Sequence, residues 1–326
     1  MEMAKAIELA RAPQGVPVAD DFRLVEQPLG APAEGEVLVR NLYASVDPYM
    51  RLTMGEPALI GRIFGGGGLG RVEQSRHSGF VEGRLVRHRM GFRTAFVSDG
   101  TGLTPFRHDP ALPIPAQMSA LGGIGLCAYG GLLHTGKLQH GEQVFVSAAA
   151  GAVGSLAVQI ARLNDCYVIG STGDEAKAEW LRSIRVDAVI NYRTQNLAEA
   201  LAAAAPRGID VYFENVGGAH LDAAIMLMNK NGRVPVCGMI SAYNSDGSVV
   251  RHLHEMIIRR VRIEGFGFDQ FYYMQEQFEA DMIGWMKSGE LVTRETILDG
   301  IERVPEALIG LFSGLNTGKM LVRLAQ

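Results

Sequence analysis

A glycine-rich turn between an apolar strand and a helix constrains this chain more than any other feature. The strand is expected over residues 143–147 and the helix over 152–163. Between them the sequence reads A-x-G-x-x-G, with Ala149, Gly151 and Gly154 at the defining positions. Gly151 allows the backbone to approach a pyrophosphate, Gly154 allows the helix to pack against the strand, and the first amides of the helix face the phosphates. Because a strand precedes this motif and a helix follows it, the turn predicts a dinucleotide-binding site rather than an ordinary small-residue turn.

Alternating strands and helices continue after this turn. The further strands are expected at 167–171, 188–191, 210–214, 232–237 and 262–267, and the helices at 175–183, 196–205, 219–228 and 253–260. Repeated βα units build a parallel sheet with helices on both faces, and such strands are apolar throughout. We therefore predict an α/β fold with a doubly wound parallel sheet of the Rossmann type.

The first hundred residues show short apolar runs between glycines and prolines, and no helical period. These runs, at 36–42, 79–81, 84–86 and 95–97, predict a strand-rich domain. A linker is expected at 105–115, then a helix from an N-cap at Ser119 to His134, and a later helix at 270–287. Strands at 291–297 and 319–324, around a helix at 305–313, are expected to rejoin the first domain. The predicted domains are therefore 1–118 with 290–326, and 119–289.

The end of the second strand indicates which dinucleotide is bound. An NAD site usually has an acid there to bind the ribose 2′-hydroxyl. Here the strand ends at Ser171 without an acid, and Asp174 and Glu175 come just after it, where acids suit a helix N-terminus. Ser171 and Lys177 are candidates to hold a 2′-phosphate, so we expect NADP(H) rather than NAD(H).

Composition excludes several classes of protein. The 326 residues carry a net charge of −4, without the basic excess of a nucleic-acid binder. The three cysteines, Cys127, Cys166 and Cys237, are too sparse for a disulfide framework and suggest a reducing compartment. Residues 1–11 are too charged for a secretory signal, and the uncharged stretches 110–136 and 143–161 are broken by glycine. We expect a cytoplasmic protein without a membrane span.

The pattern of cysteines and histidines predicts no metal site. Catalytic zinc needs three protein ligands and an open fourth position. The chain has neither C-x-x-C nor H-E-x-x-H, and its closest histidine pair, His252 and His254, suits the side of a helix.

Several segments resemble the signatures of one family. They are 42–51 (LYASVDPYMR), 148–155, 210–218 (DVYFENVGG), 237–244 (CGMISAYN) and 316–321 (NTGKML). In this order, and over essentially the whole chain, they resemble the zinc-independent medium-chain reductases of the prostaglandin/leukotriene reductase type. The resemblance implies a GroES-like catalytic domain beside the Rossmann domain, a homodimer, and NADPH-dependent reduction of the C=C bond in α,β-unsaturated aldehydes and ketones.

The resemblance also implies roles for single residues. The pyrophosphate contacts would be Ala149, Gly151, Ala152, Val153 and Gly154, and Lys177 and Tyr192 would join Ser171 at the 2′-phosphate. The ribose and nicotinamide contacts would be Asn215, Cys237, Gly238, Ile240, Ser241, Tyr243, Phe268 and Asn316. Tyr49 and Arg51 would lie at the mouth of the active site, and Tyr243 would meet the substrate carbonyl.

One segment departs from the family pattern. Residues 91–96 (GFRTAF) replace a common Trp–Tyr segment, and Arg84, Arg87, His88 and Arg89 precede them. This basic stretch is either a rim for an anionic substrate or a solvated strand, so the substrate stays open.

The expected mechanism is hydride transfer to the substrate β-carbon, with the Tyr243 hydroxyl stabilising the enolate and a ribose hydroxyl as a possible second donor. Quinone reduction with the same cofactor is an alternative, and a non-catalytic NADP-binding sensor is another. Oxidation of NADPH with enals, enones and quinones would distinguish the three.

Overall fold

The computed structural model describes residues 2–325, which form two compact units. Unit 1 comprises residues 2–111, 296–316 and 320–325, and unit 2 comprises 112–295 and 317–319. The predicted domain boundaries, 118/119 and 289/290, lie a few residues inside unit 2.

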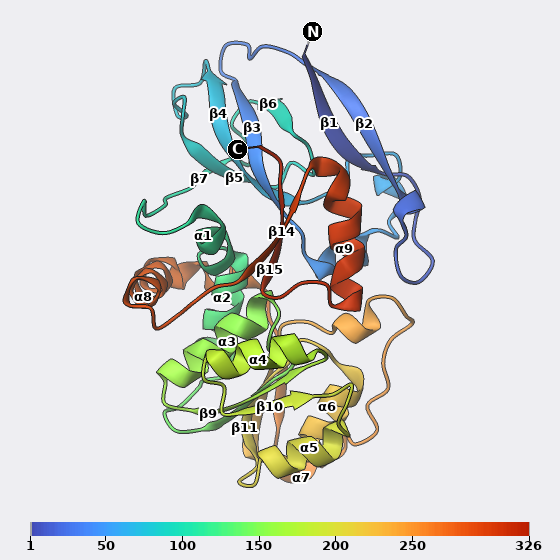
Figure 1. The fold of residues 1–326 in the computed structure, drawn as a ribbon, viewed down its shortest axis with the longest axis vertical. Helices are drawn as coiled ribbons and strands as arrows, with labels where there is room; N and C mark the ends of the chain where they lie inside the picture. The colour runs from blue at the N-terminus through green and yellow to red at the C-terminus, as the bar shows by residue number, and fades with distance from the viewer. Residues whose placement is uncertain (1, 326) are drawn as a thin grey trace. The chain divides into compact units, whose positions relative to one another are not determined.

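Unit 2 contains a six-stranded parallel sheet in the order β10-β9-β8-β11-β12-β13. Strands β9, β10 and β11 are labelled in Figure 1. The strands are β8 (Gln143–Val146), β9 (Tyr167–Thr172), β10 (Ala188–Asn191), β11 (Ile209–Phe213), β12 (Met228–Val236) and β13 (Arg262–Gly265). The order reverses direction between β8 and β11, which is where ligands bind in doubly wound sheets. The predicted doubly wound fold is confirmed.

Helices cover both faces of this sheet, because alternate strand residues enter two separate cores. Val144 and Val146 pack with α2 (Gly123–Gly130), α3 (Ala152–Leu163), α4 (Glu175–Ser183) and α8 (Gln275–Ser288). Phe145, between them in sequence, packs with α5 (Leu197–Ala204), α6 (Gly218–Ile225) and α7 (Glu255–Arg259). This period of two is the geometry of a strand buried on both faces.

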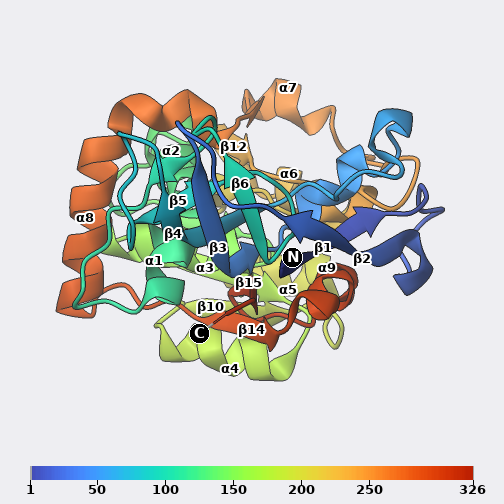
Figure 2. The ribbon, with the colours of Figure 1, turned by 90° about the horizontal axis from the view of Figure 1, so that it is seen from above.

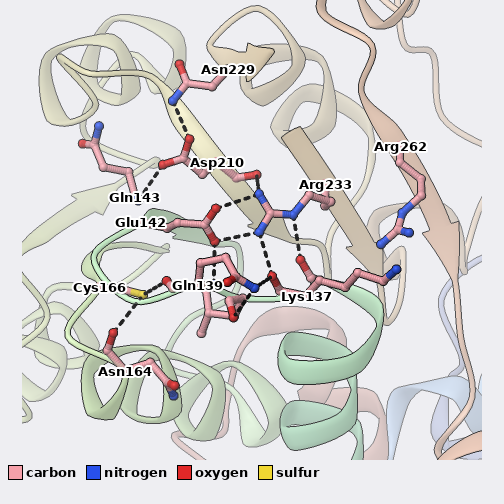
Figure 3. Close-up of polar contacts among 12 residues, drawn as sticks. Lys137, Gln139, Glu142, Gln143, Asn164, Cys166, Asp210, Asn229, Arg233 and Arg262 are labelled. Carbon is pink, nitrogen blue, oxygen red and sulfur yellow. Dashed lines mark hydrogen bonds and ion pairs between the residues drawn. The ribbon is translucent and has the colours of Figure 1, made fainter. Parts of the chain in front are cut away.

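A hydrogen-bond network around Arg233 lies where the parallel strands begin, which we call the amino edge of the sheet; the opposite side, where the strands end, is the carboxyl edge (Figure 3). Its guanidinium donates to both carboxylate oxygens of Glu142, at 2.8 and 2.6 Å, and to the backbone carbonyls of Gly136, Lys137 and Asp210. The side chains of Arg233 and Glu142 are only 16% and 17% exposed. The Asp210 carboxylate accepts from Asn229 and from the backbone of Gln143, so it joins strands β8, β11 and β12.

Unit 1 is strand-rich, as predicted, and has one longer helix, α9 (Val304–Ser313), among its residues in the described range. A two-stranded antiparallel sheet joins β1 (Glu2–Leu9) and β2 (Phe22–Leu29). A larger sheet has the order β14-β15-β3-β4-β5-β7, with β6 paired to β3 (Figure 2). Its strands are β3 (Val37–Ser45), β4 (Gly67–Ser75), β5 (Leu85–His88), β6 (Ala95–Ser98), β7 (Thr104–Pro105), β14 (Glu295–Asp299) and β15 (Lys319–Arg323).

The structure corrects the predicted helix at 119–134. The segment divides into α1 (Ile114–Ala120), α2 and a π-helical turn, Gly131–Thr135. Proline in the first turn suits a helix that begins at Ile114, and the chain breaks again at Gly122. Ser119 is therefore buried inside α1 and caps nothing.

One predicted strand in unit 1 was also wrong, and several strands were not predicted. Residues 79–81 form no strand, and β1, β2, β4 and β7 were not predicted. Most side chains of β2 are exposed and it contains Pro28, so it lacks the alternation that marks a half-buried strand.

Within residues 2–325, no single helix has the length and apolar character needed to cross a membrane. One bent pair, Ile114–Ala120 with Gly123–Thr135, meets those criteria by length and composition.

Candidate functional site

The glycine turn leaves the N-terminus of α3 open. Ala148 adopts φ +47°, and the amide of Gly151 donates to the carbonyl of Ala148 at 2.9 Å. Gly151 is the N-cap residue and has no side chain to satisfy the first amides of the helix. Ala152 and Val153 are partly exposed there. Uncapped amides at a helix N-terminus suit a phosphate group.

Steric contacts explain the two glycines. A Cβ at Gly154 would overlap the carbonyl oxygen of Ala148, and one at Gly151 would lie 3.1 Å from the same oxygen. Ala149 is buried, and its amide donates to the carbonyl of Ser171 at 2.9 Å, which ties the turn to β9. Side chains at these two positions would press against the backbone of the turn, so the tight turn that the predicted dinucleotide motif requires depends on glycine.

A segment from far along the chain borders the turn. The amide of Gly318 donates to the carbonyl of Ala150 at 2.8 Å, and Gly318 forms a parallel bridge with Gly151. Gly318 has φ +66°, and a Cβ there would overlap the carbonyl of Arg294, so only glycine fits. Asn316, a predicted ribose contact, is partly buried just before this segment and is assigned to unit 1.

Basic residues gather after β9 and β10. Asp174 caps α4 by accepting from the amide of Lys177 at 3.1 Å, as the sequence suggested. Burial lowers the pKa of the partly buried Lys177; Asp174 opposes the shift, and the positive charge of Arg193 adds to it. A Cβ at Gly173 would lie 2.6 Å from the Tyr192 hydroxyl and 3.1 Å from Arg193 Nε. A dianion would relieve the repulsion between Lys177 and Arg193.

The predicted phosphate contacts differ in burial. Ser171 is fully buried, and its hydroxyl finds no hydrogen-bond partner among the described residues, whereas Lys177 is partly exposed and Tyr192 is exposed. Arg193 was not predicted, although it follows Tyr192 directly in the sequence. The sequence signal that could have identified Arg193 is a second cation next to the predicted contact Tyr192.

His220 lies behind Tyr192. The two rings meet edge to face, with centroids 5.0 Å apart. His220 is buried at the start of α6, and its Nε2 has no hydrogen-bond partner among the described residues. Burial lowers its pKa to about 4, so the ring is neutral at pH 7.

The loop after β12 runs along the loop after β11. The amides of Cys237 and Gly238 both donate to the carbonyl of Glu214, at 2.9 and 3.2 Å. The amide of Ile240 donates to the carbonyl of Asn215 at 3.1 Å, and Ser241 donates to Val216 through its amide and its hydroxyl. The predicted ribose and nicotinamide contacts on these loops therefore come together at the carboxyl edge.

Tyr243 lies at the end of this paired loop. Its hydroxyl accepts from the amide of Met239 at 3.3 Å, which leaves its own proton available for donation. Burial raises the pKa of Tyr243, so the group is protonated at neutral pH.

The thiol of Cys237 contacts that of Cys127, and this contact and burial raise the Cys237 pKa. Phe268 packs against Gly123 and lies edge-on to Tyr272.

Tyr49 and Arg51 belong to unit 1, on the 3₁₀ helix Pro48–Thr53. The exposed Tyr49 hydroxyl accepts from Arg89 at 2.9 Å, and Arg51 donates twice to the carbonyl of Gly15. The basic stretch at residues 84–89 is thus neither wholly exposed nor without partners. His88 is buried with Nε2 at 2.7 Å from Asn41, and burial, with Arg93 nearby, lowers its pKa to about 4.

Metal ligation has no obvious place in the described part of the chain. Across residues 2–325, no three His, Cys, Asp or Glu side chains are grouped so that they could hold an ion. The prediction of a metal-free site is left for metal analysis to test.

Comparison with known proteins places this architecture. Residues 5–106 match the family model described as the N-terminal domain of oxidoreductase, and residues 152–288 match the model described as zinc-binding dehydrogenase. Prostaglandin reductase 1 of Mus musculus is 36% identical, over 99% of this chain and 100% of its own. The 2-alkenal reductase (NADP(+)-dependent) of Nicotiana tabacum is 39% identical, over 89% and 88%.

A solved structure agrees with this. The crystal structure of CurA in complex with NADPH from Vibrio vulnificus is 36% identical, covers 99% of each chain and superposes with a TM-score of 0.92. The chain belongs to the medium-chain dehydrogenase/reductase family, in the branch that contains prostaglandin reductase 1 and 2-alkenal reductase.

Proposed function

We propose that this protein is an NADPH-dependent reductase of the C=C bond in α,β-unsaturated aldehydes and ketones. The observation that carries the proposal is the carboxyl edge of unit 2, where the open α3 N-terminus, the Lys177–Arg193 cluster and the Tyr243 loop lie along one sheet edge. Relatives with 36–39% identity carry the names prostaglandin reductase and 2-alkenal reductase, which supports the same substrate class.

Different residues would bind different parts of NADPH. Ala149, Gly151, Ala152, Val153 and Gly154 would hold the pyrophosphate, and Lys177, Tyr192 and Arg193 the 2′-phosphate. Asn215, Phe268, Asn316 and the 237–243 loop (Cys237, Gly238, Ile240, Ser241, Tyr243) would hold the ribose and nicotinamide. When bound, NADPH would supply the hydride that adds to the substrate β-carbon, and water would supply the proton that completes the α-carbon.

Tyr243 has the chemistry for the remaining step. As negative charge grows on the carbonyl oxygen, a neutral hydroxyl whose acceptor side is already occupied by Met239 is oriented to donate its proton in a hydrogen bond. Within unit 1, Tyr49, whose hydroxyl accepts from Arg89, and Arg51 stay predicted substrate contacts.

The test is a screen of NADPH oxidation with enals, enones and quinones, with product analysis. We expect saturated aldehydes and ketones with the carbonyl intact. Tyr243→Phe should slow single-turnover hydride transfer by up to about 10²–10³-fold and leave NADPH affinity unchanged. An allylic alcohol, quinone turnover alone, or tight NADPH binding without turnover would refute the proposal.

We also propose a homodimer formed through β13. This strand is at the edge of the parallel sheet, and the neighbouring α7 exposes Ile257 and Ile258 to 77% and 67%. Open strand edges and apolar patches pair readily with a second copy. Sedimentation velocity should find a dimer that Ile257→Glu with Ile258→Glu converts to monomer, and a monomeric wild type would contradict this.

The thiols of Cys127, Cys166 and Cys237 are free. This supports our proposal that the enzyme works in the reducing cytoplasm.

A further inference from the structure

Glu214 is a fully buried acid at the carboxyl edge, directly after β11. Its Oε1 accepts from the Ser147 hydroxyl at 2.9 Å and from the amide of Val216 at 2.6 Å. Its Oε2 is buried and makes no hydrogen bond of normal geometry among the described residues, and the buried Tyr212 hydroxyl is the polar group that interacts with this carboxylate. Burying a carboxyl group is costly, and leaving one oxygen without a hydrogen bond of normal geometry adds to that cost. Stability alone is a poor explanation for this residue.

The backbone of Glu214 connects its own loop to the next one. Its amide donates to the carbonyl of Pro235 at 2.9 Å, and its carbonyl accepts from Cys237 and Gly238. The start of the 237–243 loop is therefore hydrogen-bonded to this single residue.

Ser147, after β8, extends the same network to Asn215. The Ser147 hydroxyl donates to Glu214 and accepts from the amide of Asn215 at 2.9 Å. The Asn215 side-chain nitrogen donates to the carbonyl of Ser147 at 2.7 Å. This bond uses one of the two hydrogens on the nitrogen and fixes the amide, so the second hydrogen and the side-chain oxygen of Asn215 are the groups left to face a ligand.

We propose that Glu214 is a positioning residue for the nicotinamide–ribose half of the cofactor. It joins the ends of β8, β11 and β12, and through Ser147, Val216 and Cys237 it sets the placement of Asn215 and of the 237–243 loop. The 2′-phosphate cluster of Lys177, Tyr192 and Arg193 follows two other strands, β9 and β10. This inference rests on the proposed function, because it assumes that NADPH binds here.

Two ligands separate positioning from general support of the fold. Adenosine 2′,5′-bisphosphate carries the 2′-phosphate and the adenosine but no nicotinamide, whereas NADPH carries both halves. Calorimetry with wild type, Glu214→Gln and Glu214→Asp should show NADPH affinity falling at least tenfold in Glu214→Gln. Affinity for the bisphosphate should stay within twofold, and Glu214→Asp should recover part of the NADPH loss. Arg233→Lys is the matched control, since it weakens the opposite edge of the sheet and should leave the ratio of the two affinities unchanged.

Each outcome is decisive. Equal losses for both ligands, or unchanged NADPH affinity, overturn the positioning role. If Glu214→Gln does not fold, Ser147→Ala removes only one hydroxyl and must shift the ratio in the same direction, or the inference is wrong. Wild type that binds neither ligand would overturn the proposed function itself, and the inference with it.

Discussion

Buried polar groups at the two edges of the parallel sheet in unit 2 differ in how completely they are hydrogen-bonded. At the amino edge, Arg233 uses its donors on Glu142 and on three carbonyls, and Asp210 accepts from two further groups. Among the described residues, six buried side-chain atoms have no hydrogen-bond partner; four of them, on Ser171, Tyr212, Glu214 and His220, lie toward the carboxyl edge, and the other two are on Arg93 and Glu295. Folded proteins satisfy nearly all buried polar groups, so a majority of exceptions at one edge indicates where stability gives way to function.

The largest effect should come from the amino edge. Arg233→Ala leaves the Glu142 carboxylate mostly buried without its partner, which should lower the free energy of unfolding by about 3–5 kcal/mol. NADPH affinity of the folded variant should be unchanged, because the network is at the opposite edge from the glycine turn. Urea denaturation and calorimetry measure the two quantities.

An exposed ion pair provides the control for that variant. Arg182→Ala, which removes the partner of Glu175 on the surface of α4, should leave the denaturation midpoint unchanged. A similar loss in both variants would mean that burial of the Arg233 pair is irrelevant.

The carboxyl edge should show the reverse pattern. Replacing Lys177 with Ala removes a charge-assisted contact to the 2′-phosphate, so NADPH binding should weaken by about 1.5–3 kcal/mol. Arg193→Ala should act in the same direction, and NADH affinity and the denaturation midpoint should hardly change. Equal losses of NADPH and NADH would show that neither residue reads the phosphate.

A smaller effect should depend on pH. The pKa of His220 is about 4 in the folded protein and about 6.5 when unfolded, so between these values only the unfolded chain binds the proton. The free energy of unfolding should therefore fall as pH drops from 6.5, by about 2 kcal/mol at pH 5. His220→Leu should lose this part of the slope, while the contribution of His88 persists. Identical slopes in the two proteins would place the acid sensitivity elsewhere.

The parts that could be predicted from sequence are local. Residues within a few positions of one another determine the glycine turn, the ends of α3 and α4 and the Asp174 cap, so the sequence pattern predicts them. The complete burial of Ser171 was not predicted, because position at a strand end does not reveal burial, which depends on neighbouring strands.

The networks could not be predicted, because their members are far apart in the chain. Glu214 bonds Ser147 across 67 residues, and His88 bonds Asn41 across 47. No periodicity links such positions. Strand β2 was missed for a different reason, since most of its side chains are exposed and no clear alternation marks it.

The bond between Gly318 and Ala150 has a consequence for biosynthesis. Most of the nucleotide-binding unit is translated by residue 295, yet the segment 317–319 that borders its glycine turn emerges from the ribosome only after twenty-one residues of the other unit, 296–316. Domains tend to fold as they are made, N-terminal parts first. Until then the carbonyl of Ala150 is hydrogen-bonded to water in the nascent unit. The bond from Gly318 to Ala150 forms only after residues 317–319 have been synthesised.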